Sequence, residues 1–578
     1  MGKLKKSINK IIDFIISPIM KNSLFYVSVF CLLSISVLFV KHHGSRLRIG
    51  LEFFFDVYLI SAFITIIPTC CRKYIQWGLF ILLAIIGIID MACYKATGIA
   101  LSPNIVTAWL QTNGKEAAEA ILSYCTTSFI ISPLILFLIL PIGIYILKKI
   151  KFKFNRRLAM LLTLITIISA IYGLENKKYI YDTLKIKTDD TMVEVCNFKD
   201  ISREYLPHYR LIYSLKEISR FSNMEQNLRK NIGTATVNSC SFESPVIVLI
   251  IGESYNRHHS SLYGYEKCTT PCQEQLQKEE NLYSFTDVIA SYNLTFKSFQ
   301  NVLSLYSYGK PGNWYDYPLV TTLFKKAGYN VSFFSNQFCL DKKSSLSTFI
   351  DDVFINNEEL SPQMFDNRNA KPRKYDLELI EEYNRYCNTD KNSPQFIIFH
   401  FIGVHSLFSE RYPDGFAKFN KSDYDRKDLK EEEKEILAHY DNAIYYNDFV
   451  IDSIAKCFKE KEAIIIHAPD HGELVYDCGT LFGRNLQLEK EIVQPQYDIP
   501  FSIYCSPLYK EKHPDICEAI KNSTERPFMT DDLPHLLLHL AGIECPEYEE
   551  ERNLIGENFN YNRKRVIRGE IDYDELCK

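Results

Sequence analysis

Acidic and histidine side chains follow apolar runs at three separate points of the sequence. Glu253 follows VIVLIIG, His405 follows FIIFHFIG, and Asp470 and His471 follow AIIIHAP. Carboxylates and imidazoles are ligands suited to zinc or manganese. An isolated Asp-His pair is more often a turn with a hydrogen-bonded histidine, but three such sites together favour a divalent metal. We expect zinc, with manganese as the alternative.

The elements that must position these side chains are short strands. SPVIVLIIGES, YNVSFFSN, PQFIIFHFIG, EAIIIHAPDHG and YDIPFSIYC each contain a β-rich run, and helical stretches separate them. Continuous apolar runs without alternation indicate strands that are covered on both faces, which favours a mostly parallel sheet sandwiched by helices. Ligands of such sheets bind beyond the carboxyl ends of the strands. The acids and histidines above should therefore meet at one edge.

The first part of the chain has a different composition. Its apolar stretches lie at roughly 23–40, 49–69, 77–94, 128–147 and 158–174. Each approaches the ~20 residues that a helix needs to cross a bilayer. If the N-terminus is inside, the inner segments carry 13 Lys and Arg and the outer loops 5, which places everything after residue 175 outside. We expect a transmembrane domain of five helices at 1–174, an amphipathic linker at 175–242 and a catalytic domain at 243–578.

Charge is divided unequally between these parts. Residues 1–174 hold 18 Lys and Arg and 6 Asp and Glu, whereas the whole chain has a net charge of −4. The acidic remainder argues against a nucleic-acid partner, which requires basic surface. Glu52, Asp56 and Asp90 lie in or beside the apolar stretches. They are either solvated at the membrane interface or functional, for instance facing a cationic headgroup.

The nucleophile is not settled by chemistry alone. Ser254, Thr269, Thr270 and Thr295 are all candidates. Ser254 directly follows Glu253, and adjacent side chains of an extended strand point to opposite faces. If Glu253 faces a metal, Ser254 should then point away.

Several motifs in series resemble one known family. They are IGESYNRHHSSLYGYEKCTTP, LVTTLFKKAGYNVSFFSNQ, FHFIGVHSLFSERYPDGF, YDNAIYYNDFVI, APDHGELVYD and DDLPHLLLHLAGI. In this order, behind apolar helices, they look like the bacterial phosphoethanolamine transferases of the alkaline phosphatase and sulfatase superfamily. The resemblance covers nearly the whole chain and is closer to the branch that modifies the lipopolysaccharide core than to the lipid A enzymes.

The resemblance implies roles for particular residues. The family's metal ligands match Glu253, Asp470 and His471, and its catalytic threonine, also a ligand, matches Thr295. Its HxxxxH motif falls on His400 and His405, which in the family assist with substrate or a second metal; a buried core histidine is the alternative for His400. One departure stands out: Arg484 occupies the place of an expected histidine. Arginine does not bind zinc, but its guanidinium can hold a phosphate through two hydrogen bonds.

The resemblance also implies a reaction and a place. The donor would be phosphatidylethanolamine in the bilayer, and the acceptor lipopolysaccharide or another envelope glycan, with a phosphothreonine-type intermediate. The protein would be a multi-pass protein of the bacterial inner membrane with its catalytic domain in the periplasm. The alternatives are a glycerol-phosphate transferase of the same superfamily and a catalytically silent glycan-binding relative. A sulfatase is disfavoured because the nucleophile position has no CxPxR-like segment.

Overall fold

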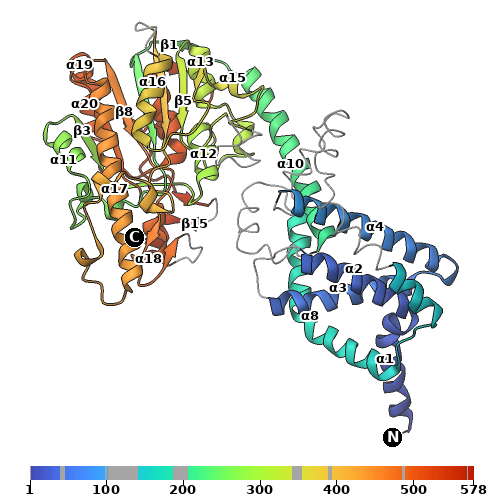
Figure 1. Cartoon of the computed structure of the whole chain (residues 1–578). Coiled ribbons are helices and arrows are strands. Elements are labelled where there is room, and N and C mark those ends of the chain that lie inside the picture. The colour runs from blue at the N-terminus through green and yellow to red at the C-terminus, as the bar shows by residue number, and fades with distance from the viewer. Residues whose placement is uncertain are drawn as a thin grey trace. The chain divides into compact units, whose positions relative to one another are not determined.

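The computed structural model divides the chain into two compact units, Met1–Ser222 and Asn223–Lys578 (Figure 1). The structure describes residues 2–39, 46–97, 101, 141–185, 206–340, 354–387, 393–483, 489–568 and 571–577. Helix α10 (Pro207–Thr234) runs across the boundary between the two units. The division predicted at 174 and 242 therefore stays a prediction.

The first unit is helical. Its long helices are α1 (Gly2–Lys21), α2 (Ser23–Phe39), α3 (Arg46–Ile66), α4 (Thr69–Thr97), α8 (Arg156–Lys185) and the beginning of α10. α3 packs against α1 and α8, and α2 packs against α4. Their shared core is apolar, with Ile19, Val29 and Val57 fully buried.

Four of the predicted apolar stretches coincide with α2, α3, α4 and α8, and most of the fifth, 128–147, lies outside the described residues. Among the described helices, α4 is long and apolar enough to cross a membrane over Thr69–Tyr94. α1 and α2 meet the same criteria only as a pair, bent by 64°. The five membrane crossings therefore stay a prediction.

The three acids of this unit are buried, so their interpretation as solvated interfacial acids is wrong. Asp90 Oδ1 accepts hydrogen bonds from Arg210 Nε at 2.8 Å and from the backbone N of Leu101 at 3.0 Å. Asp56 pairs with Lys177 and accepts a hydrogen bond from Tyr209. Glu52 is equally buried, at 1% exposure. Because Tyr209 and Arg210 belong to the first turn of α10, Asp56 and Asp90 fix that end of α10 to α3 and α4.

The second unit is built on a seven-stranded sheet in the order β3-β11-β8-β2-β7-β5-β6. All five predicted strands form: β2 (Val246–Ile251), β5 (Asn330–Ser335), β7 (Gln395–His400), β8 (Ala463–His467) and β11 (Phe501–Cys505). The sequence missed two edge strands, β3 (Leu282–Phe285) and β6 (Asn367–Arg368). β8, β2, β7, β5 and β6 run parallel, whereas β11 is antiparallel to both β8 and β3. The sheet is therefore mixed.

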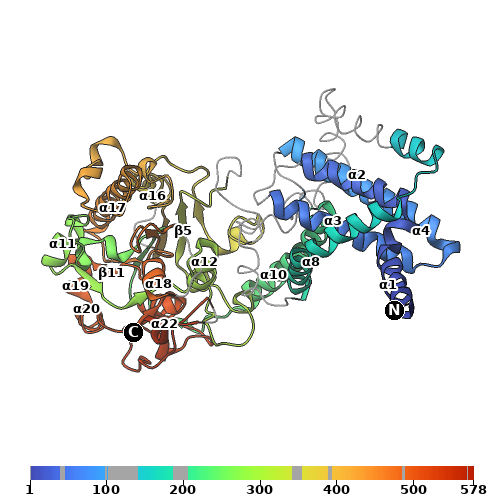
Figure 2. The ribbon, with the colours of Figure 1, turned by 90° about the horizontal axis from the view of Figure 1, so that it is seen from below.

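Helices cover both faces of this sheet, as the uninterrupted apolar strands predicted. Two residues on opposite faces of β7 show this: Phe399 belongs to the core under α16 (Leu379–Cys387) and α17 (Glu431–Phe458), and Phe396 stacks on Phe324 of α13 (Val320–Ala327). α12 (Thr295–Leu303) lies on the side opposite α16 and α17 (Figure 2). α21 (Leu533–Ala541) packs against α12 and α13.

Smaller elements complete the unit. Among the residues that the structure describes, the other α-helices of this unit are α11 (Pro271–Lys278), α15 (Ser361–Met364), α18 (Lys490–Tyr497), α19 (Pro507–Lys512), α20 (Pro514–Lys521) and α22 (Tyr573–Cys577). Four two-stranded sheets pair β1 (Ser239–Cys240) with β13 (Ile543–Glu544), β4 (Val288–Ile289) with β12 (Phe528–Met529), β9 (Leu474–Val475) with β10 (Phe482–Gly483), and β14 (Val566–Ile567) with β15 (Ile571–Asp572).

Candidate metal centre and active site

The predicted metal ligands meet because β2 and β8 are parallel neighbours. Glu253 follows β2 by two residues, and Asp470 and His471 follow β8 by three and four. One ligand atom from each of these three residues lies within 4.8 Å of the other two, and all three side chains are buried. The carboxyl edge of the sheet thus brings together two carboxylates and an imidazole.

Backbone and side-chain hydrogen bonds hold these residues in place. The backbone N of Asp470 donates to the carbonyl of Gly252 at 3.0 Å. Asp470 Oδ1 in turn accepts hydrogen bonds from the backbone N of Ser254 at 3.1 Å and of His471 at 2.7 Å. The two ligand-bearing segments are therefore joined to each other directly at the site.

The donor set fits zinc in both type and protonation. His471 Nδ1 lies 2.7 Å from the carbonyl oxygen of Gly472, which makes Nδ1 the protonated nitrogen and leaves the lone pair on Nε2. Nε2 lies 3.4 Å from Asp470 Oδ2 and 3.5 Å from Glu253 Oε1. A neutral imidazole nitrogen and two carboxylate oxygens are common ligands of catalytic zinc.

Two of the four candidate hydroxyls contact Glu253. Thr295, the first residue of α12, donates from Oγ1 to Glu253 Oε2 at 3.0 Å and lies 3.5 Å from His471 Nε2. Ser254 donates from Oγ to Glu253 Oε1 at 2.7 Å. The hydroxyls of Thr269 and Thr270 instead form hydrogen bonds with residues of the segment 259–262. Thr295 is the candidate hydroxyl that also approaches the imidazole.

Ser254 does not lie in an extended strand, so the prediction that its side chain points away from that of Glu253 is wrong. β2 ends at Ile251, and Ser254 has a left-handed backbone with φ of 56°. Its side chain is turned back onto the carboxylate of Glu253 rather than away from it. It is also only 1% exposed, whereas Thr295 is half-buried. Ser254 therefore acts here as a buried hydrogen-bond donor to a ligand.

His405 and His400 occupy different surroundings. The loop that carries His405 contacts one of the candidate metal ligands, since Val404 donates its backbone N–H to the carbonyl of Glu253 at 3.1 Å. Gly403 permits this approach: a Cβ there would lie 2.8 Å from the backbone N of Glu253. His405 itself is half-buried.

His400 is sealed inside the unit. It is 0% exposed, and its ring packs against Phe299 and Phe338. Nδ1 lies 2.9 Å from Ser335 Oγ. Burial lowers the pKa of His400 to about 3, so that it is neutral. These surroundings favour the core-packing alternative for His400. Arg484 lies outside the described residues.

Sequence reasoning missed Gln337. It follows β5, and its Nε2 donates to Glu253 Oε2 at 2.9 Å and to the carbonyl of Phe401 at 2.8 Å. The amide thus fixes the carboxylate of a ligand relative to the end of β7. Its position two residues beyond a predicted strand, on the same edge as Glu253, was the available signal.

Asp376 is a second residue that the sequence did not single out. Oδ1 accepts the backbone N–H of Ile402 and Oδ2 that of Gly403, both at 2.9 Å. Burial raises its pKa to about 6 in spite of these hydrogen bonds. Asp376 therefore shapes the loop that presents His405.

Comparison with known proteins identifies the family of this chain. The profile of the family described as Sulfatase matches residues 245–543. Phosphoethanolamine transferase EptC of Escherichia coli (strain K12) is 30% identical over 348 residues, which cover 58% of this chain and 58% of that protein. Phosphoethanolamine transferase CptA of Salmonella typhimurium (strain LT2) is 28% identical over 344 residues, 57% of each chain. The chain therefore spans little more than half the length of these curated relatives.

A solved structure matches as well. The C-terminal periplasmic domain of EptC from Escherichia coli, determined in complex with Zn, has a TM-score of 0.51 at 28% sequence identity. The match covers 59% of this chain and 96% of that domain. The resemblance seen in the sequence motifs is thereby confirmed, as is the α/β fold of the second unit. The chain belongs to the sulfatase family, and the relatives described above, which are similar to it in sequence, are named phosphoethanolamine transferases.

Proposed function

We propose that this protein is a metal-dependent transferase that moves phosphoethanolamine from phosphatidylethanolamine to an envelope glycolipid, either the lipopolysaccharide core or lipid A. One observation carries the proposal. The hydroxyl of Thr295 lies 3.0 Å from Glu253 Oε2 and 3.5 Å from His471 Nε2, beside a buried group of metal-ligating atoms. The names of the relatives, and the zinc bound by the EptC domain, support it.

Glu253, Asp470 and His471 would hold the metal, with Thr295 as a further ligand. Zinc at such a site acts as a Lewis acid that lowers the pKa of a hydroxyl and stabilises charge on phosphoryl oxygens. Manganese is the alternative ion, because two of the three side chains are carboxylates.

Thr295 would be the nucleophile. Its Oγ forms a bond to the phosphorus of the donor while the bond from phosphorus to the glycerol oxygen breaks, and diacylglycerol leaves with the proton. In a second step an acceptor hydroxyl or phosphate attacks the phosphothreonine and regenerates the Thr295 hydroxyl. Because Thr295 is the first residue of α12, the backbone N–H groups of the first turn and the dipole of that helix favour the negative phosphoryl group.

His405 and Arg484 would contact the substrate. His405 lies on the loop that abuts Glu253, within the half-buried edge of the site. The guanidinium of Arg484 would hold phosphate oxygens through paired hydrogen bonds. His400 would support this edge from the core through its contact with Ser335.

The first unit would keep the enzyme in the inner membrane as a multi-pass protein, with the second unit in the periplasm. The donor's acyl chains remain in the bilayer, so the reacting centre must meet the headgroup at the membrane surface. The apolar α4 and the α1–α2 pair support membrane association. Asp56 and Asp90 are already paired with Lys177 and Arg210, which argues against a contact between these two acids and the donor ammonium.

The test uses the purified full chain, zinc and two labelled donors. Phosphatidylethanolamine or phosphatidylglycerol is supplied with lipopolysaccharide, and the products are examined by mass spectrometry. A phosphoethanolamine increment on the glycolipid, with loss of diacylglycerol, is the expected result. A glycerol-phosphate increment would instead identify a glycerol-phosphate transferase. Glycan binding without turnover of either donor would identify a silent relative.

A further inference from the structure

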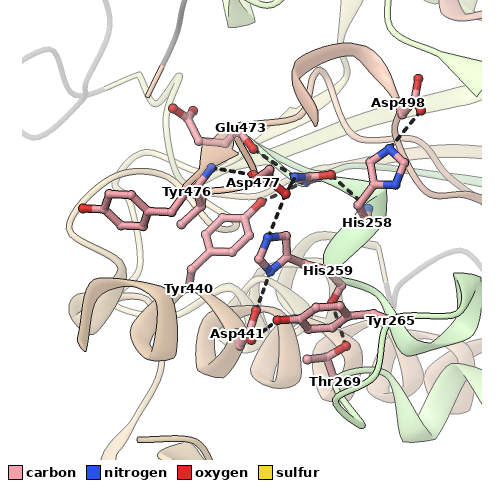
Figure 3. A network of polar contacts seen from close by, with 12 residues as sticks. His258, His259, Tyr265, Thr269, Tyr440, Asp441, Glu473, Tyr476, Asp477 and Asp498 are labelled. Carbon is pink, nitrogen blue, oxygen red and sulfur yellow. Dashed lines mark hydrogen bonds and ion pairs between the residues drawn. The ribbon is translucent and has the colours of Figure 1, made fainter. Parts of the chain in front are cut away.

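A second group of buried titratable side chains lies outside the metal centre, around His259 (Figure 3). His259 ends a short 3-10 helix, Arg257–His259, and is 4% exposed. Its Nδ1 lies 2.7 Å from Asp441 Oδ1, and its Nε2 lies 3.2 Å from Asp477 Oδ1. Asp441 belongs to α17, and Asp477 follows β9. One imidazole thus bridges carboxylates from two remote segments.

The imidazole of this bridge is favoured in its protonated form by the two carboxylates beside it. Burial opposes protonation, but Asp441 and Asp477 outweigh it and raise the pKa of His259 to about 10. Both ring nitrogens are therefore donors. Asp441 also accepts hydrogen bonds from Tyr265 at 2.8 Å and Tyr424 at 2.6 Å, which fix its orientation.

Asn256 connects the bridge to both segments that carry the metal ligands. Its Nδ2 donates to Asp477 Oδ1 at 3.1 Å and to the carbonyl of Glu473 at 3.2 Å. Asn256 lies three residues after Glu253, and Glu473 lies two residues after His471. A displacement of Asp477 would therefore act on the segments on both sides of the metal centre.

α17 reaches the same place through Tyr440, the neighbour of Asp441. Its hydroxyl accepts the backbone N–H of Asn256 at 2.9 Å and donates to the carbonyl of Ser254 at 2.8 Å. Ser254 directly follows Glu253. The helix thus holds the segment 254–256 through Tyr440 and the segment that ends at Asp477 through Asp441 and His259.

We propose that His259 is a positioning residue, whose imidazole ties α17 to the segments 253–259 and 470–477 and so sets the separation of Glu253 from Asp470 and His471. The inference rests on the proposed metal centre, but its geometry concerns the folded chain before metal is added. His258 offers a matched control. It is the same residue type in the same turn, is half-exposed, and contacts Asp498 at 3.0 Å instead of the bridge.

The first measurement is hydrogen exchange of the metal-free full chain. In His259→Gln, backbone exchange should accelerate in both 254–259 and 471–477, because the charged link between them is lost. In His258→Gln, exchange in 471–477 should stay as in the parent chain. Acceleration confined to 254–259 in His259→Gln would overturn the inference.

The second measurement is metal binding by the same proteins. His259→Gln should bind zinc about 3-fold to 10-fold more weakly, which is less than the roughly 10-fold to 100-fold typical when a direct hydrogen-bond partner of a metal ligand is lost. Its cobalt(II) derivative should show an altered visible spectrum, whereas His258→Gln should match the parent in both. Zinc affinity within twofold of the parent and an unchanged cobalt spectrum would overturn the inference.

Two further outcomes remain: a variant that does not fold, and a parent chain that binds no metal. If His259→Gln does not fold, Asp477→Asn replaces it, since this change keeps the size of the side chain and removes the charge at one end of the bridge. The same two measurements then decide. If His259→Gln accelerates exchange in both segments but the parent chain binds no metal, the structural role of His259 stands and the proposed metal-dependent function fails.

Discussion

Buried acids occur in both units of this protein, but their partners differ. Asp90 accepts hydrogen bonds from two nitrogens of Arg210, at 2.8 and 2.5 Å, and Asp56 forms an ion pair with Lys177. In the second unit the carboxylates of Glu253 and Asp470 converge with the imidazole of His471. An acid that is bonded to a guanidinium or ammonium has its charge balanced within the fold.

The difference teaches that burial alone does not identify a functional acid. Burying a carboxylate is costly unless it is paired or binds a metal. In the first unit, ion pairs with Lys177 and Arg210 offset the desolvation of Asp56 and Asp90, and these pairs join different helices. The second unit groups acids with a neutral ligand nitrogen and a hydroxyl, an arrangement that a divalent ion stabilises.

The largest expected effect comes from removing the hydroxyl beside the acids of the second unit. Thr295→Ala should reduce phosphoethanolamine transfer at least about 1,000-fold, because the nucleophile is lost. The melting temperature should change little, since Thr295 is half-buried at the start of a helix. Thr295→Ser is the matched control and should retain measurable transfer. Unchanged transfer by Thr295→Ala would remove Thr295 as the nucleophile.

Metal removal tests whether the buried acids of the second unit hold a metal ion. Stripping zinc with a chelator should abolish transfer, and readdition should restore it. Zinc at 1,000 times its Kd stabilises the site-bearing unit by about 4 kcal/mol, so thermal unfolding should shift clearly between the two forms. A chain that unfolds and turns over identically with and without chelator would show that these acids hold no functional metal.

Breaking an acid pair of the first unit should affect stability instead. Asp90→Asn leaves Arg210 buried without its counter-charge, which typically costs about 3–5 kcal/mol. The control is Asp13→Asn, because Asp13 pairs with Arg156 at the surface, where such pairs contribute about 1 kcal/mol or less. Denaturant unfolding in detergent micelles measures both. Equal effects of the two substitutions would contradict a buried structural pair.

The sequence predicted the second unit well because its signals are local. Uninterrupted apolar runs gave the strands, and their neighbours Glu253, Asp470 and His471 meet because parallel strands end at one edge. Thr295 could be chosen only through resemblance to a family, since residue chemistry left four hydroxyls open. The two-residue β6 has too few residues to show a pattern.

What the sequence could not predict depends on contacts between remote residues. The pair of Asp90 and Arg210 joins helices 120 residues apart, and nothing local marks Arg210 as the partner. Ser254 fails a rule for extended strands because the chain turns left-handed there. Gln337 reaches Glu253, and His259 reaches Asp441 and Asp477, only because segments remote in the sequence pack together.

A smaller effect on the metal centre is expected from Gln337→Leu. Losing the amide that holds Glu253 Oε2 and the carbonyl of Phe401 should weaken zinc binding about 10-fold, with the ligands themselves intact. Gln363→Leu is the control, because Gln363 is exposed and its amide bonds only to the nearby carbonyl of Glu359. A zinc titration against a competing chelator measures both. Equal affinities would show that Glu253 needs no such support.

The last prediction concerns how the free energy of unfolding depends on pH through His259, a buried cation between two acids. The pKa of His259 is raised to about 10, against about 6.5 for an unfolded histidine. Its protonation therefore stabilises the fold fully below about pH 6.5, and this contribution is lost as the pH rises toward 10. Tyr265 and Tyr424 stay neutral over this range, because burial and Asp441 raise their pKa values. The difference in free energy of unfolding between the parent chain and His259→Gln should accordingly be largest near pH 6 and shrink toward pH 10. A difference that is constant across this range would mean that His259 is neutral in the fold.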